Sequence, residues 1–242
     1  MRKLLEFILL SLVFIPCITV HAEESEEPWY LQWKQCSEEW GSEVIASSGN
    51  IMTKGACSET SQAVIIKLAG LENSDDFTPL TYLRWAEKSG QAFAQSMLYQ
   101  SAVGNYTDDN MVLKESVRDS KYNDDDAIFS LVADAYQKGY FIIMHISHAK
   151  GGGHFVPVVG VDLNKKIIWV NQVGRNDLPG VLNYTEYYGN SNQDEIMDGA
   201  DFYECETATL KQVNEGDAYM QNLLGLSSIS NSELLENIIG GN

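Results

Sequence analysis

The sequence predicts an α+β protein in which a largely helical first half precedes an antiparallel sheet. In the first half, apolar residues recur with helical spacing and the segments end at glycine. After Gly139 the pattern changes to short runs of β-branched and aromatic residues separated by turn residues. Two of these runs are joined only by Asp162–Lys165, a connection short enough for an antiparallel hairpin. This order of elements favours an α+β arrangement over a doubly wound parallel sheet.

Three helices are expected in the first half, and local residues mark their ends. In the second, Thr78 is suited to cap the start, Pro79 fits the first turn and Gly90 stops the helix. The third follows a cluster of three aspartates, which favour a helix N-terminus. The expected helices run from Cys57 or Ser58 to Leu68, from Thr78 to Gly90, and from Ala127 to Gln137.

Strands are expected in the second half, where β-branched residues dominate. The predicted strands are Tyr140–Ile146, His154–Val161 and Lys166–Val170. Tyr203–Glu206 is a candidate for a further strand, and Asp217–Leu226 for a final helix.

Residues 1–22 have the features of a secretory signal peptide. Two basic residues precede an apolar run from Phe7 to Ile15, and a small-residue cleavage signal ends at Ala22. The apolar run is too short for a spanning helix. We therefore expect a secreted, extracellular protein with no stable membrane insertion after cleavage. Residues 23–242 are expected to form a single domain, because no linker or repeat divides them.

The composition argues against one class of partner. The 242 residues include 16 basic and 34 acidic side chains, a net charge of -18 at pH 7. Phosphate backbones select basic surfaces, so a nucleic acid is not an expected partner. With 44% hydrophobic and 21% charged residues, the chain has the composition of a folded domain.

Cys57 follows the Gly55-Ala56 break and stands at the predicted start of a helix. The helix dipole and the unpaired N–H groups of a first turn favour thiolate over thiol. We therefore interpret Cys57 as a candidate nucleophile, and expect it to be the one thiol that iodoacetamide labels at about pH 6. The alternative is a buried helix-entry cysteine or one half of a disulfide.

His154 follows three glycines and opens a predicted strand. An imidazole at the start of a strand, beside a flexible loop, can contact both a nucleophile and a substrate. A third group is then expected to orient the ring. The next strand ends at Asn171-Gln172, and because successive strand residues point to opposite faces, only one of the two can take this role.

At this point the chain resembles papain-like cysteine peptidases related to the double-glycine bacteriocin-leader peptidases. The residues that carry the resemblance lie roughly between positions 33 and 173: Trp33-Lys34-Gln35, Glu39-Trp40-Gly41, Cys57-Ser58-Glu59-Thr60-Ser61, the Gly-Gly-His motif ending at His154, and the apolar strand to Asn171.

This resemblance implies a papain-like fold, with an N-terminal helical lobe that carries Cys57 and a C-terminal antiparallel sheet that carries His154. By the same resemblance Cys57 is the nucleophile, His154 is the base and Gln35 helps to form the oxyanion hole. The implied substrate is a peptide or protein, and no cofactor is required.

Two departures from the family pattern bear on activity. Ala56 and Ser58 stand where the family usually has glycine on each side of the cysteine. The family also tends to have Asn-Asp-Pro where this chain has Asn171, Gln172 and valine. The orienting carboxylate thus becomes an amide at Gln172, which we favour over Asn171 as the third member. An amide still orients a histidine but lacks the charge that stabilises imidazolium.

The other cysteines and histidines have weaker signals. Cys36 and Cys205 either form a disulfide or are separate buried thiols, and the sequence leaves both possibilities open. His145 and His148 lie upstream of His154 with no recognised zinc spacing, so no metal site is expected.

The sequence therefore predicts a secreted hydrolase that cleaves peptide or amide bonds through an acyl-enzyme on Cys57, with His154, Gln35 and Gln172 completing the site. One alternative is a peptidoglycan amidase or endopeptidase, since wall hydrolases use a similar cysteine and histidine. Another is a catalytically inactive binding protein that keeps the fold, which the replaced glycines and carboxylate would permit.

Overall fold

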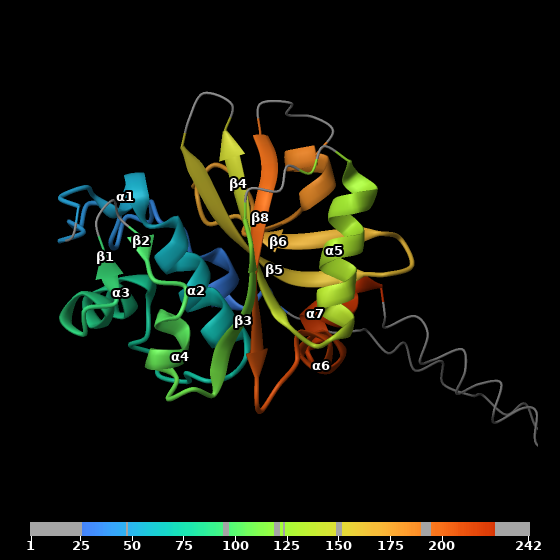
Figure 1. The fold of residues 1–242 in the computed structure, drawn as a ribbon, viewed down its shortest axis with the longest axis horizontal. Helices are drawn as coiled ribbons and strands as arrows, with labels where there is room; N and C mark the ends of the chain where they lie inside the picture. Colours follow the sequence, from blue (N-terminus) through green and yellow to red (C-terminus); the bar gives the residue numbers. More distant parts are fainter. Residues whose placement is uncertain are drawn as a thin grey trace, which may run out of the picture.

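The computed structural model describes residues 26–46, 48–93, 97–118, 122, 124–148, 152–189 and 195–225. In this part of the chain a six-stranded antiparallel sheet has helices on both sides (Figure 1). The predicted signal peptide lies outside the described residues.

The large sheet has the strand order β3-β8-β4-β5-β6-β7, and every neighbouring pair is antiparallel. Its strands are β3 (Met111–Val117), β4 (Phe141–His148), β5 (Gly153–Asp162), β6 (Ile167–Asn171), β7 (Val181–Asn183) and β8 (Glu195–Cys205). A separate two-stranded sheet pairs β1 (Ala92–Phe93) with β2 (Met97–Leu98).

The helices divide between the two sides of the large sheet (Figure 1). One side carries the helices from the first part of the chain: η1 (Trp29–Gln32), α1 (Met52–Gly55), α2 (Cys57–Leu68), α3 (Pro79–Lys88) and α4 (Ala102–Tyr106). On the other side are α5 (Asp125–Gln137), α6 (Leu210–Gly216) and α7 (Ala218–Leu224). A short π-helix, η2 (Thr185–Gly189), follows β7.

Local sequence explains why the three predicted helices form where expected. Thr78 and Thr81 make a capping box at the start of α3, with Pro79 as its first residue. The Asp124 side chain accepts a hydrogen bond from the Asp126 N–H and caps α5. Gly139 follows α5 with φ +84°, a conformation that glycine adopts without strain. The predicted helix positions are thus confirmed.

Helix α2 is the central element of the molecule. It packs against β5 on one side and α3 on the other, and ten of its residues are buried. The core therefore lies between α2 and the sheet, with a second apolar layer under α5, α6 and α7. This packing places the start of α2 beside the start of β5.

The predicted separation of helices from strands is only partly correct. The mixed α+β class and the antiparallel sheet are confirmed, including the β5–β6 hairpin. However, β3 comes from the first half of the chain and pairs with β8, and the predicted strand at Tyr203–Glu206 is the end of this longer strand. No helix in the described ranges combines the length and apolar character needed to cross a membrane.

Candidate active site

Cys57 is the first residue of α2, as the sequence predicts. The preceding Ala56 has φ -98° and is fully buried. This backbone angle is open to any residue, so alanine causes no strain there. The next residue, Ser58, is also buried.

The ionisation of Cys57 differs from the expectation. Although the residue keeps some exposed surface, burial around the thiol raises the pKa of Cys57 to about 11. Backbone N–H groups of Phe155, Ser58 and Cys57 itself act in the opposite direction, and the charge of Glu59 adds to the rise. The helix start does favour thiolate, but desolvation outweighs it, so the resting form of Cys57 is a neutral thiol.

His154 is the second residue of β5 and pairs with Ile146 of β4. The pKa of His154 is lowered to about 4, mainly by burial and to a smaller extent by the charges of His148, His145 and Lys34. Its Nε2 atom is buried without a hydrogen-bond partner among the described residues. The ring is therefore a neutral imidazole at neutral pH.

Gly174 lies directly against the His154 ring. A Cβ atom at Gly174 would lie 2.8 Å from Cε1 and 2.9 Å from Nε2 of His154. Since real Cβ contacts are essentially never this short, any side chain at position 174 would displace the imidazole from this position.

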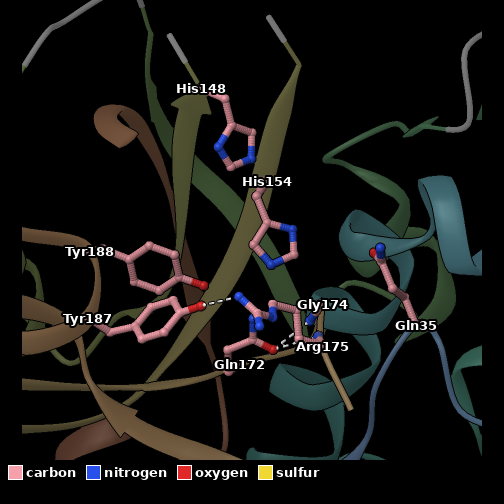
Figure 2. A pocket seen from close by; sticks show the side chains of 8 residues that line it. All are labelled: Gln35, His148, His154, Gln172, Gly174, Arg175, Tyr187 and Tyr188. Atoms are coloured by element: carbon pink, nitrogen blue, oxygen red, sulfur yellow. Dashed lines mark hydrogen bonds between the residues drawn. The ribbon is translucent and has the colours of Figure 1, made fainter. Parts of the chain in front are cut away.

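Three of the four predicted site residues meet in one cavity of about 220 Å³ (Figure 2). Figure 2 shows His154 between Gln35 on one side and two tyrosines on the other, with Gln172 below the ring. The lining residues are Gln35, His148, His154, Gln172, Gly174, Arg175, Tyr187 and Tyr188.

Cys57 does not line this cavity but adjoins it through Phe155, the neighbour of His154. The backbone N–H of Phe155 interacts with the Cys57 thiol, and its carbonyl accepts a hydrogen bond of 3.0 Å from Ser61 Oγ, one turn further along α2. The first turn of α2 is thus attached to β5 next to His154.

Gln35 reaches the cavity from the segment after η1. Its backbone N–H donates to the Val173 carbonyl at 2.7 Å, and its Nε2 donates to the Thr53 carbonyl at 2.9 Å. An amide nitrogen carries two N–H groups, so one remains for a substrate oxygen. The Oε1 atom of Gln35 is buried without a partner among the described residues.

The structure separates Asn171 from Gln172. Asn171 is fully buried, and its Nδ2 donates to the carbonyls of Leu31 and Gly180, the latter at 3.0 Å. Gln172 lines the cavity with His154. This placement agrees with the expected alternation of the two side chains.

Among the described residues, Gln172 nevertheless makes no hydrogen bond to His154. Its Oε1 accepts two bonds of 2.8 Å from the backbone N–H groups of Gly174 and Arg175 (Figure 2). Because these donors fix the amide orientation, the Nε2 group of Gln172 is the one left for other partners. Its orienting role therefore stays a prediction.

The sequence interpretation missed part of the cavity wall. Arg175 pairs with Asp177 at 2.5 Å and donates to the Tyr187 hydroxyl at 3.2 Å, while Tyr187 and Tyr188 come from η2. These residues stand in loops and a short π-helix, where hydrophobic periodicity carries no signal. Only the density of tyrosines near position 187 is visible in the sequence.

Two of the remaining candidates lie beside the site: Cys36 Sγ donates to the Gly174 carbonyl at 3.2 Å, and His148 lines the cavity. Cys36, Cys57 and Cys205 are all free thiols, so Cys36 and Cys205 do not form a disulfide. His145 pairs with Asp198 on the neighbouring strand. Within the described ranges, no three or more His, Cys, Asp or Glu side chains gather as a metal site would require.

In comparisons with known proteins, no family model matches the sequence and no curated protein matches it.

Proposed function

We propose that this protein is a cysteine hydrolase that cleaves peptide bonds of an extracellular peptide or protein substrate. The observation that carries the proposal is the joint placement of four side chains. Gln35, His154 and Gln172 line one cavity, and the thiol of Cys57 interacts with the backbone next to His154. Nucleophile, base and an amide donor within one region are what acyl transfer requires.

The ionisation of the resting site determines the form of the mechanism. With the pKa of Cys57 raised to about 11 and that of His154 lowered to about 4, thiol and imidazole are both neutral. The thiol proton therefore moves to His154 as Sγ attacks the substrate carbonyl, rather than before substrate binds. The free N–H of the Gln35 amide donates to the developing oxyanion.

Collapse of the tetrahedral intermediate completes the cycle. The scissile C–N bond breaks, the imidazolium of His154 gives its proton to the leaving amine, and the acyl group stays on Cys57. Water then attacks the thioester while His154 takes its proton, the C–S bond breaks, and His154 gives the proton to the Cys57 sulfur, which releases the acid and restores the thiol.

One observation favours a second candidate, an inactive binding protein that keeps this fold. His154 Nε2 has no acceptor among the described residues, because Gln172 Oε1 is occupied by two backbone donors. A base that receives a proton at one ring nitrogen needs an acceptor for the N–H at the other. If this acceptor is missing throughout the catalytic cycle, turnover is lost while the cavity still binds a peptide.

The experiment that separates these candidates is a cleavage profile of the mature protein. A peptide library and a muropeptide mixture are incubated with wild type, Cys57→Ala and His154→Ala, and products are identified by mass spectrometry. The proposal predicts peptide cleavage by wild type alone. Peptide binding without cleavage supports the inactive candidate, and cleavage confined to muropeptides supports a wall hydrolase.

A further inference from the structure

Lys34 is a buried lysine that lies between Gln35 and the loop after β6. It is 7% exposed, and its Nζ donates to the backbone carbonyl of Gln172 and, at 2.8 Å, to that of Pro179. Its own carbonyl accepts a bond of 2.8 Å from the Trp40 indole. The next residue is Gln35, which lines the cavity.

The loop held by Lys34 joins β6 to β7 and forms one wall of the cavity. Residues 172–180 leave and return to the sheet at adjacent points, where the Gln172 N–H donates to the Gly180 carbonyl at 2.7 Å. Between these ends the loop supplies Gly174, against which the His154 ring lies, and Arg175. The position of this loop therefore sets the surroundings of His154.

The two carbonyls that Lys34 binds are near opposite ends of the loop. A single ammonium between Gln172 and Pro179 ties the ends together from behind the cavity. Hydrogen bonds from a charged donor are stronger than neutral ones. An additional contact between Asn176 Nδ2 and the Cys36 carbonyl, at 2.8 Å, is exposed.

The charged surroundings of Lys34 come from three segments. Burial lowers the pKa of Lys34 to about 8, while Cys36, Glu27 and Asp177 raise it. Glu27 Oε1 is buried without a hydrogen-bond partner within the described ranges, and it faces the same cavity behind the loop as Lys34. On the site side, the charge of Lys34 reaches His154 and lowers its pKa.

We propose that Lys34 is a positioning residue of this site. Its buried ammonium holds the 172–180 loop closed by binding the Gln172 and Pro179 carbonyls, and so keeps Gly174 and Gln172 against His154. The effect on turnover rests on the proposed function, whereas the effects on the loop and on His154 do not.

The test uses three variants of the mature protein. Lys34→Met keeps the length of the side chain and removes its charge and donors, and Lys34→Arg keeps both. Lys88→Met removes an exposed ammonium at the end of α3 and is the matched control. Amide hydrogen exchange over residues 172–180 reports the loop, and NMR titration of the His154 ring reports its electrostatic surroundings.

In Lys34→Met we expect exchange in the loop to rise about tenfold or more, because two charge-assisted bonds are lost. The pKa of His154 should rise, because a neighbouring positive charge is gone. Lys34→Arg should keep the His154 pKa near the wild-type value, and Lys88→Met should change neither readout. Where wild type hydrolyses a peptide, kcat should fall more than KM rises.

Unchanged loop exchange and an unchanged His154 titration in a folded Lys34→Met variant would overturn the proposal. Should that variant not fold, wild type is measured across pH 7–10 with correction for intrinsic exchange. Loop protection should then decrease as Lys34 loses its charge, and constant protection overturns the proposal. If the wild-type protein hydrolyses no peptide, the proposed function is refuted. The exchange and titration results still decide the role of Lys34 in that case.

Discussion

Gly174→Ala is the sharpest perturbation of the candidate site, because it adds one methyl group beside His154. The new Cβ would lie 2.8 Å from Cε1 and 2.9 Å from Nε2 of His154, and 3.4 Å from Gln172 Nε2. Gly174 is not among the glycines with positive φ, so alanine fits the backbone and only the contact is tested. Ordinary carbon contacts are about 3.5–4.0 Å long, so the imidazole must move by roughly 1 Å.

A displacement of this size has two measurable consequences. Overpacking costs about 1–3 kcal/mol of unfolding free energy. Misplacing a catalytic group by about 1 Å lowers turnover by about 10²-fold, so kcat/KM should fall by that order. Chemical denaturation measures the first effect, and steady-state hydrolysis of a peptide measures the second.

The matched control is Gly216→Ala, at the end of α6. A Cβ at Gly216 would have no atom within 4 Å, and Gly216 likewise lacks a positive φ. This variant should keep wild-type stability and turnover. Equal kcat/KM values for Gly174→Ala and wild type, together with an unshifted His154 Cε1–H resonance, would refute the placement of Gly174 against the ring.

Three further predictions follow from buried groups near the site. Because burial raises the pKa of Cys57 to about 11, iodoacetamide should label it slowly at pH 6 and faster at each higher pH up to about 11, whereas rapid labelling at pH 6 would restore the sequence-based expectation. Glu59 is fully buried and its pKa is raised to about 8, so it binds its proton more tightly in the folded state and stability is lost as pH rises from about 4.5 to 8. Glu59→Gln should therefore gain stability over wild type at high pH: the difference in unfolding free energy should be roughly 2–4 kcal/mol larger at pH 8 than at pH 4.5. If denaturation experiments find the same difference at both pH values, this prediction is wrong. Asn171→Ala should lower stability by about 1–3 kcal/mol with turnover per folded molecule nearly intact, whereas Gln172→Ala should lower turnover, and the reverse ranking would assign the orienting role to Asn171.

The parts of the fold that depend on local signals could be predicted from the sequence. Helices α2, α3 and α5 begin and end near the cap, proline and glycine residues that mark them. The strands β4, β5 and β6 are apolar because helices cover the sheet on both sides.

The parts that depend on distant pairing could not be predicted. Strand β3 lies at the edge of the sheet, and its apolar and polar residues fall in separate blocks, so no alternating pattern marks it. In β8, glycine and aspartate interrupt the apolar pattern. One of them, Asp201, is buried and pairs with Arg118 from the segment after β3 at 2.6 Å. Such a partner is known only once the strands are paired.

The candidate site shows the same division. Cys57, His154 and the opposition of Asn171 to Gln172 were accessible from element boundaries and strand alternation. The ionisation of Cys57 was not, because a helix start indicates its dipole but not the burial that outweighs it. Arg175 and the tyrosines of η2 line the cavity because of the conformation of a loop and a short π-helix. Hydrophobic periodicity in the sequence does not indicate such a conformation.

The proposed hydrolysis passes through an acyl group on Cys57. The most direct measurement is intact-protein mass spectrometry after rapid acid quenching of the mature protein with an activated peptide ester, followed by mapping of the modified residue. The expected result is a transient adduct on Cys57 that disappears as product forms, that is absent in Cys57→Ala, and that forms far more slowly in His154→Ala. Product formation that survives in Cys57→Ala, or an adduct that maps to Cys36 or Cys205, would contradict it.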